Sequence, residues 1–224
     1  MAERTRRHDS DRVAVIGLGR FGGQVADALV GLGHEVLAVD QDATRVDKWK
    51  ERLTYVVQAD ATQVRVLRQL GIHEFSRVVV GLGSALDASV LTVLALAEIG
   101  VPEIWARSTS SRHSRILSAV GAQRVIFPEA AMGDRVAHLI TTRLLDFTEF
   151  HASLAVAEIR APRELHGRTV GESGLRQRYG VTVVAVQRPG EDFVFAGGDT
   201  VIAPDSVLAV AGRSAQLEHF AAVT

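Results

Sequence analysis

A glycine motif between a strand-like and a helix-like segment constrains the fold of this chain more than any other feature. The apolar run 13–16 leads directly into Gly17-Leu-Gly19-Arg-Phe-Gly22, and an apolar periodicity typical of a helix follows. With this spacing, the first glycine allows a tight turn, the second lets the backbone approach a pyrophosphate, and the third allows close helix packing. The helix N-terminus offers free N–H groups to phosphates. The motif predicts a nucleotide-binding turn, although the glycine spacing alone also suits a plain strand-to-helix connection.

An acidic residue ends the next predicted strand. The segment 34–40 reads His-Glu-Val-Leu-Ala-Val-Asp, and Asp40 stands about 20 residues beyond the glycines, where a ribose-binding carboxylate belongs. A carboxylate there accepts hydrogen bonds from ribose hydroxyls and repels a 2′-phosphate. The position therefore disfavours NADP.

Strand-like and helix-like segments alternate through the first half of the chain. Glycine, proline and polar residues, which are typical of turns and helix caps, separate these segments. After 13–16 and 34–40, the predicted strands are 54–57, 76–80, 103–107 and 124–127, and the predicted helices are 42–52, 63–70, 85–99 and 111–120. This alternation predicts an α/β fold with a Rossmann-type, doubly wound parallel sheet of six strands.

Two more segments stand at the predicted carboxyl ends of strands. The segment 60–62 (Asp-Ala-Thr) follows the third strand, and the segment 81–83 (Gly-Leu-Gly) follows the fourth. Open parallel sheets bind ligands at this edge, so both segments are candidate contacts. Thr62 is also a candidate cap for the helix 63–70, and the glycine pair would equally suit a plain loop.

A further helix is predicted from Pro128-Glu129 to about Leu145. Its apolar residues form one stripe at helical spacing, namely Met132, Val136, Leu139, Ile140 and Leu144. No seventh strand is predicted to follow and cover this stripe, which suggests that the helix docks on a second subunit. Alternatively, it is an ordinary packing helix. Residues 146–152 are predicted to form a linker.

Beyond the predicted linker the pattern changes to short β-rich segments separated by turn residues. The predicted strands are 154–159, 181–186, 193–195 and 207–211, and the predicted helices are 170–178 and 214–222. A unit of about 70 residues is small for an independent domain, so pairing with a copy of itself would stabilise it. The predicted organisation is a disordered leader at 1–12, a nucleotide-binding domain at 13–128, an interface helix and linker at 129–151, and a small α+β domain at 152–224.

Composition excludes several classes of function. The 25 basic and 26 acidic side chains nearly cancel, so no nucleic-acid-binding surface is indicated. The absence of cysteine excludes disulfides, thiolate zinc sites and thiol nucleophiles, and it fits a reducing cytoplasm. The charged residues 1–12 predict a disordered leader and not a signal peptide. The longest apolar run, 90–97, is too short to span a bilayer, which predicts a soluble protein.

Several motifs together resemble those of the cytoplasmic regulatory subunits of Ktr/Trk potassium-uptake systems. In the first half they are VAVIGLGRFGG at 13–23, HEVLAVD at 34–40, DAT at 60–62, GAQRVIFPE at 121–129 and Met132-Gly133. In the second half they are LHGRT at 165–169, YG at 179–180, DT at 199–200 and DSVLAVAG at 205–212. The resemblance covers essentially the whole chain after the leader.

The resemblance implies a cytoplasmic protein at the inner face of the membrane, which dimerises and forms an octameric ring beneath a potassium translocator. It implies that ATP, ADP or NAD(H) in the first domain reshapes this ring. Glu129 matches a position near the phosphates or near a bound cation where two subunits meet. Some family members bind cyclic di-AMP between paired C-terminal domains, and Arg176 lies near where an arginine contact is found. The candidate nucleotide contacts are Gly17, Gly19, Arg20, Phe21, Gly22, Asp40, Gln41, Asp60, Ala61, Gly81, Leu82, Gly83, Arg107 and Glu129.

Arg20 is the candidate group for recognising a terminal phosphate. It stands at the start of the helix after the glycines, where a guanidinium can clamp phosphate oxygens. ATP and ADP share adenine, ribose and two phosphates, so only a group that reaches the third phosphate can distinguish them. Alternatively, Arg20 is a solvated arginine of the first helical turn.

An NAD-dependent oxidoreductase with a small second domain is the alternative interpretation. Such an enzyme needs a proton-transfer group, usually histidine, lysine or tyrosine. The two lysines, Lys48 and Lys50, share one predicted surface helix, and the eight histidines show no metal-binding spacing. His138 and His151 are the nearest catalytic candidates, and we interpret them as surface or interface residues. A redox-sensing repressor would need a helix-turn-helix or a basic patch, and the sequence shows neither. A nucleotide-binding regulator that is not an enzyme is the favoured interpretation.

Overall fold

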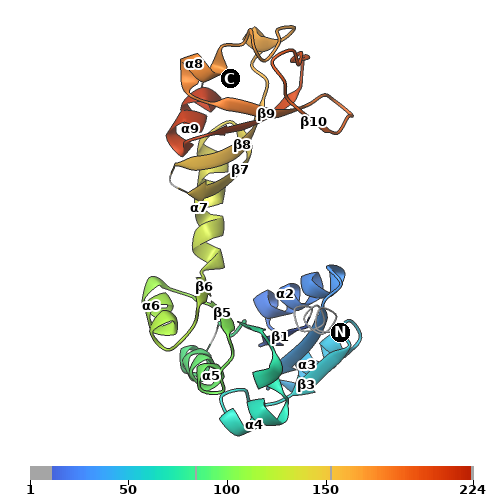
Figure 1. Ribbon diagram of the computed structural model, residues 1–224, viewed down its shortest axis with the longest axis vertical. Coiled ribbons are helices and arrows are strands. Elements are labelled where there is room, and N and C mark those ends of the chain that lie inside the picture. The colour runs from blue at the N-terminus through green and yellow to red at the C-terminus, as the bar shows by residue number, and fades with distance from the viewer. Residues whose placement is uncertain (1–11, 84, 152, 223–224) are drawn as a thin grey trace, which may run out of the picture. The chain divides into compact units, whose positions relative to one another are not determined.

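The chain is built from two compact units that divide between Glu129 and Ala130 (Figure 1). The computed structural model describes residues 12–83, 85–151 and 153–222. Residues 1–11 of the predicted leader lie outside the described residues, while Arg12 already belongs to the first strand.

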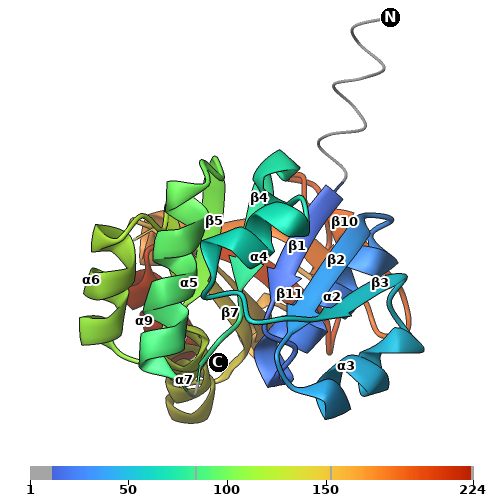
Figure 2. The same ribbon diagram turned by 90° about the horizontal axis from the view of Figure 1, so that it is seen from below.

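The first unit contains a six-stranded parallel sheet, as the alternating pattern predicts. Its strand order is β3-β2-β1-β4-β5-β6, the order of a doubly wound dinucleotide-binding fold. Figure 2 shows β3, β2 and β1 side by side. The strands are β1 (Arg12–Ile16), β2 (Glu35–Asp40), β3 (Tyr55–Gln58), β4 (Arg77–Val80), β5 (Glu103–Arg107) and β6 (Arg124–Ile126).

Helices cover both faces of this sheet. Successive side chains of β1 point to opposite faces, so that Ala14 and Ile16 join one buried cluster while Val15 joins the other. The helices α2 (Arg20–Gly31) and α3 (Ala43–Lys50) cover the face of Val15. The opposite face is covered by α4 (Val64–Gln69), η1 (Ile72–Glu74), α5 (Leu86–Glu98) and α6 (Ser111–Ala119).

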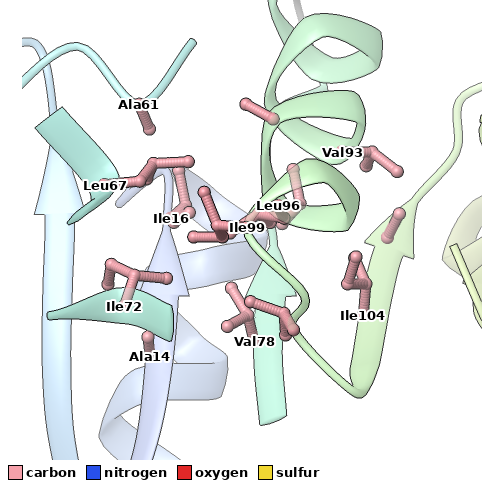
Figure 3. Close-up of a cluster of buried hydrophobic side chains, with 14 of the residues drawn as sticks. Ala14, Ile16, Ala61, Leu67, Ile72, Val78, Val93, Leu96, Ile99 and Ile104 are labelled. Atoms are coloured by element: carbon pink, nitrogen blue, oxygen red, sulfur yellow. The ribbon is translucent and has the colours of Figure 1, made fainter. Parts of the chain in front are cut away.

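The larger of the two clusters holds α5 against the strands. Figure 3 shows Val93, Leu96 and Ile99 at the interface between α5 and the sheet, near Val78 of β4 and Ile104 of β5. Val93, Leu96, Val78 and Ile104 have no exposed surface. Burying a side chain of this size contributes about 1.5–3 kcal/mol, so this cluster fixes the position of α5 and of the loop before it.

The second unit contains a five-stranded sheet in the order β10-β9-β11-β8-β7, with every pairing antiparallel. Its core is apolar and includes Leu165, Leu208, Leu217 and Phe220, all without exposed surface. The strands are β7 (Leu144–His151), β8 (Leu154–Arg160), β9 (Thr182–Gln187), β10 (Phe193–Phe195) and β11 (Val207–Gly212). The helical elements are α7 (Pro128–Thr141), η2 (Arg163–Leu165), α8 (Leu175–Tyr179) and α9 (Ser214–Ala222).

The predictions for the segment after Glu129 are wrong in two respects. The helix predicted to reach Leu145 ends at Thr141, and residues 146–151 of the predicted linker lie in β7. The register of β7 against β8 shifts twice, between Leu144 and Asp146 and between Glu149 and His151. Each shift breaks the alternation by which a strand is recognised in a sequence.

The predicted apolar stripe is therefore divided. Leu144 is buried in β7, and Leu139 packs against the second core. Met132, Val136 and Ile140 remain exposed on α7, with Ile140 78% exposed. The exposed apolar stripe on α7 is therefore limited to these three residues of the predicted five.

The helix predicted at 170–178 is also too long, since α8 begins only at Leu175. Gly174 has φ +62°, and the N–H of Gly171 donates to the Gly198 carbonyl at 2.8 Å. The left-handed backbone at Gly174 and the pairing of Gly171 with a carbonyl distant in sequence both prevent a helix from starting earlier.

Three glycines allow β1, α2 and β4 to approach closely. A Cβ on Gly22 would overlap the Gly17 carbonyl oxygen, and a Cβ on Gly81 would lie 2.9 Å from Gly22 Cα. Gly17 also has φ +91°, which other residues rarely adopt. The contact therefore requires glycine at all three positions.

Replacing Gly22 with alanine should destabilise the first unit by about 2 kcal/mol or more, because the new methyl group overlaps backbone. Both tryptophans, Trp49 and Trp105, lie in the first unit, so tryptophan fluorescence during urea unfolding reports on that unit. The matched control is Gly31→Ala in the same helix, where a Cβ meets no atom within 4 Å. This control should be neutral or stabilising by about 0.4–1 kcal/mol. Equal stability of the two variants would contradict the proposed close contact.

Candidate functional site

Two neighbouring cavities lie at the carboxyl ends of the first sheet. The first has a volume of about 560 Å³ and the second about 130 Å³. Gly17, Arg45 and Leu82 line both, so the cavities adjoin. The switch in strand order between β1 and β4 is where an open parallel sheet opens a ligand crevice.

The glycine turn forms one wall of both cavities. The Gly17 N–H donates to the Val39 carbonyl at 2.7 Å, and the Gly81 N–H donates to the Ile16 carbonyl at 2.7 Å. Gly19 caps α2 without a side-chain hydrogen bond, and a Cβ there would meet nothing within 4 Å. No contact with the described residues accounts for a glycine at this position. Its missing side chain leaves the N-terminus of α2 open to the first cavity.

Positive charge dominates the first cavity. Four basic side chains line it, Arg20, Arg45, Lys48 and Arg107, and its lining includes no acidic residue. The N-terminus of α2 adds a partial positive charge. The cavity is therefore suited to an anion of several charges, such as a pyrophosphate group.

Arg107 occupies the centre of a small network at the end of β5. Its Nη2 donates to Glu129 Oε1, and its guanidinium carbon lies 5.8 Å from the centroid of the Phe21 ring. The hydrogen bond from Arg107 lowers the pKa of Glu129, and the charge of Arg20 adds to this effect. The Nε of Arg107 is buried without a hydrogen-bond partner among the described residues. Arg107 therefore retains a buried donor that its protein contacts do not satisfy.

Asp40 is fixed at the carboxyl end of β2. It is 3% exposed, and its carboxylate accepts from the backbone N–H of Leu18 at 2.6 Å and of Asp42 at 2.9 Å. Arg45 Nη1 lies 3.5 Å from Asp40 Oδ2. These contacts orient the carboxylate beside the glycine turn, and Asp40 lines the second cavity.

Asp60 and Thr62 also line the second cavity. Thr62 Oγ1 donates to Asp60 Oδ1 at 2.7 Å, and Gln63 Nε2 donates to Asp60 Oδ2 at 2.9 Å. The hydrogen bond from Thr62 is the main cause of the lowered pKa of Asp60. Thr62 does not cap the next helix, because the N-cap of α4 is Gln63. The predicted capping role is therefore wrong.

A buried hydroxyl in the second cavity was not predicted. Thr92 of α5 has no exposed surface, and its Oγ1 has no hydrogen-bond partner among the described residues. It lines the second cavity with Ala85 and Ala88. An unsatisfied buried hydroxyl costs about 1–3 kcal/mol, so a ligand that supplies a partner gains this energy.

Most predicted site residues meet at these cavities. Phe21, Gly22 and Glu129 line neither cavity, although Phe21 and Glu129 both contact Arg107. The first cavity is lined by Gly17, Gly19, Arg20, Gly81, Leu82, Gly83 and Arg107, and the second by Gly17, Asp40, Gln41, Asp60, Ala61 and Leu82. Arg45 and Lys48 were not predicted as contacts, although their spacing of three residues on α3 places them on one helix face.

The described residues contain no group of three or more histidine, cysteine, aspartate or glutamate side chains that could hold a metal ion. None of the described helices combines the length and apolar character that a membrane span requires.

The fold and the paired cavities define a Rossmann-type ligand-binding unit followed by a small antiparallel β domain. The family description "TrkA-N domain" matches residues 13–128, and "TrkA-C domain" matches residues 154–223. The chain is 36% identical over 208 residues to Ktr system potassium uptake protein C of Bacillus subtilis, covering 92% of this chain and 94% of that relative. It is 33% identical over 215 residues to Ktr system potassium uptake protein A of the same organism, covering 96% and 97%. The chain belongs to the family of Ktr/Trk potassium uptake proteins that carry TrkA-N and TrkA-C domains.

Solved structures show the same fold. The RCK domain of GsuK has a TM-score of 0.67 at 20% identity, covering all of this chain and 52% of that chain. A structure described as the GsuK channel bound to NAD has a TM-score of 0.66 at 21% identity, covering 97% of this chain and 41% of that chain. The predicted fold class is confirmed.

The ion pair of Arg107 with Glu129 predicts a pH-dependent contribution to stability. The folded pKa of Glu129 is lowered, so its contribution is present above the ordinary glutamate pKa of about 4.3 and is lost as pH falls through the folded value. Glu129→Gln should therefore be less stable than the natural protein at pH 7, and the difference should vanish in acid. Urea unfolding between pH 3 and 7, followed by tryptophan fluorescence, measures it. The control Glu98→Gln removes an exposed carboxylate of α5 and should give little difference at any pH. A difference for Glu129→Gln that persisted at low pH would contradict the assigned cause.

Proposed function

We propose that this protein is a nucleotide-binding regulatory subunit of a membrane potassium-uptake system, acting at the cytoplasmic face of the membrane. One observation carries the proposal: a cavity lined by four basic side chains adjoins a smaller cavity that contains a fixed carboxylate and an unsatisfied hydroxyl. This order of groups matches the phosphate, ribose and base of a nucleotide. The names of the Ktr relatives supply the potassium-uptake context.

The nucleotide is oriented with its phosphates in the first cavity. The pyrophosphate lies at the N-terminus of α2, next to Gly19 and Arg20, and its charge is neutralised by the basic lining. Asp40 accepts hydrogen bonds from the ribose hydroxyls. The base enters the second cavity, whose 130 Å³ is close to the roughly 150 Å³ that holds a single aromatic ring.

Regulation arises at the phosphate end of the nucleotide. A third phosphate near Arg20 competes with Glu129 for the guanidinium of Arg107, so ATP and ADP leave Glu129 in different states. Glu129, once released, is available to a cation shared with the phosphates or with a neighbouring subunit. In this proposal the protein forms dimers within an octameric ring, and the change at Glu129 is transmitted to the ring and then to the translocator. Cyclic di-AMP near Arg176 remains a prediction from the resemblance.

The histidine His138 does not support the NAD-dependent alternative. His138 lies in the second unit, where its Nδ1 is 2.9 Å from Glu218 Oε1 and its ring is 4.5 Å from the Phe147 ring. These contacts give His138 a packing role. The side chain of His151 lies outside the described residues.

Asp40→Ala should weaken ATP and NADH binding roughly tenfold, equivalent to about 1.4 kcal/mol, and should weaken NADPH binding least. The loss follows from the missing ribose contact, and the relative gain for NADPH follows from removing a charge that repels the 2′-phosphate. Calorimetric titration with ATP, ADP, NADH and NADPH measures these affinities. The control is Asp47→Ala, an acid of α3 paired with Lys50 at 2.7 Å.

The same variants test the regulatory role. Potassium flux is measured in vesicles that contain a Ktr-type translocator, with the protein added and nucleotide varied. We expect a nucleotide-dependent flux with the natural protein and Asp47→Ala, and a shift to higher nucleotide concentration with Asp40→Ala. Unchanged nucleotide affinity in Asp40→Ala contradicts the ribose contact. A potassium flux that does not change when the protein is added contradicts the regulatory role.

Thr92→Val should stabilise the free protein by about 1 kcal/mol and weaken binding of adenine nucleotides several-fold. Valine keeps the shape of threonine and removes an unsatisfied hydroxyl, while the base loses a hydrogen-bond partner. Ser89→Ala is a matched control, because Ser89 is also buried and unsatisfied on α5 but does not line the cavity. It should stabilise the protein without changing affinity. Urea unfolding and calorimetry together measure both effects, and equal affinities of the two variants would exclude contact between Thr92 and the base.

A further inference from the structure

We propose a second anion-binding site in the C-terminal unit, specific for a small phosphorylated molecule that carries a hydroxyl group. It is a cavity of about 420 Å³ between the ends of three strands. Arg143, Arg160, Arg163 and His166 line it, with Asp205 as the single acidic residue of its lining. The volume falls within the range of about 300–1,000 Å³ typical of small-molecule sites.

The sheet itself brings two of these arginines together. Leu144 of β7 pairs with Ile159 of β8, so their chain neighbours Arg143 and Arg160 lie at the same end of the two strands. Arg160 also pairs with Val207 of β11, two residues beyond Asp205. Like charges held close together repel one another. A bound anion would remove this repulsion.

The arginines of the cavity have no acidic partner within the described part of the chain. The structure gives no ion pair to Arg143, Arg160 or Arg163, whereas Arg135 and Arg178 in the same unit each form one. Two acids near these arginines in sequence are already engaged. Asp146 accepts from Arg135, and Glu164 accepts from Arg178 at 3.1 Å. The formal charge of the lining is therefore positive before His166 is counted.

His166 adds a directed hydrogen-bonding group. Its Nε2 lies 3.1 Å from the Ala161 carbonyl, and because a carbonyl only accepts, Nε2 must carry the hydrogen. Nδ1 is then left for a second partner. The Ala161 N–H donates to the Ser206 carbonyl at 2.8 Å, so the β8–β11 framework fixes the group that orients the ring.

These groups specify the chemistry of the ligand. Guanidinium groups bind phosphate oxygens through paired N–H donors, and three of them from separate elements enclose a phosphate from several sides. The carboxylate of Asp205 accepts from a ligand hydroxyl and disfavours an anion without one. A phosphorylated metabolite and a lipid headgroup share this chemistry. Arg176, the residue implied for cyclic di-AMP, does not line this cavity, and the proposal is independent of the nucleotide site in the first unit.

Hydrogen–deuterium exchange of the full-length protein tests the proposal. Inorganic phosphate and glycerol 3-phosphate are the probes, and the segment 160–168 is monitored separately from the glycine turn at 17–23. We expect saturable protection of 160–168 and tighter binding of glycerol 3-phosphate. Arg163→Gln, on the exposed turn η2, should weaken this binding about tenfold, since it removes one charge-assisted contact. The control Arg188→Gln removes an exposed arginine of the same unit outside the cavity and should change nothing.

Vesicles distinguish the two sources of phosphate. If phosphatidylglycerol vesicles, but not phosphatidylcholine vesicles or free probes, protect 160–168 in a way that Arg163→Gln weakens, the site binds a lipid headgroup. The proposal is overturned if no probe and no vesicle protects 160–168, or if Arg188→Gln weakens binding as much as Arg163→Gln. Protection confined to 17–23 would also overturn it while leaving the proposed nucleotide site intact.

Discussion

The backbone contact at Gly17, Gly22 and Gly81 is the constraint on which the first unit depends. Because no side chain separates these residues, the N-terminus of α2 lies directly beside the ends of β1 and β4. Both cavities share Gly17 as a lining residue, so this one contact sets the position of the phosphate-type and the base-type regions together. If the glycine turn packed less closely, the N-terminus of α2 would lie farther from the first cavity. Its partial positive charge would then add less to that of the basic residues that line this cavity.

The two adjoining cavities differ in the charge of their linings, although Arg45 lines both. The first has only basic residues among its charged lining groups, while the second includes Asp40, Asp42 and Asp60. A ligand with an anionic end and a hydrogen-bond-donating end is oriented by this division before any shape matching occurs. Arg107 stands at the anionic end with Glu129 as its internal partner. In the proposed mechanism a phosphate of the ligand competes with this carboxylate for Arg107, which is a physical basis for a response to phosphate number.

Much of the first unit could be predicted from the sequence, because its strands are short apolar runs and most of its helices, α3 excepted, end at or shortly before a glycine. The strand β7 could not, since its two register shifts remove the alternation that reveals a strand. The length of α8 could not either, because it depends on the pairing of Gly171 with a distant backbone carbonyl. Within the site, the motif predicted Asp40 and the glycines. Thr92 was missed because a hydroxyl without a partner is a property of packing, and Arg45 and Lys48 were missed because charged residues on a helix usually face solvent.

The pairing between β7 and β8 has a consequence for how the chain acquires its structure during synthesis. His151 pairs with Leu154, so these two strands form a local hairpin, and hairpins close in about 1–10 μs. In the first unit, by contrast, Val13 pairs with Arg77, and at about 5–20 residues per second the ribosome delivers Arg77 seconds after Val13. Although β1 can pair with β2 earlier, its second edge waits for β4, whereas β7 finds its partner almost as soon as both are made. Protection of the nascent chain by chaperones therefore matters more for the apolar first strand than for the β7–β8 hairpin.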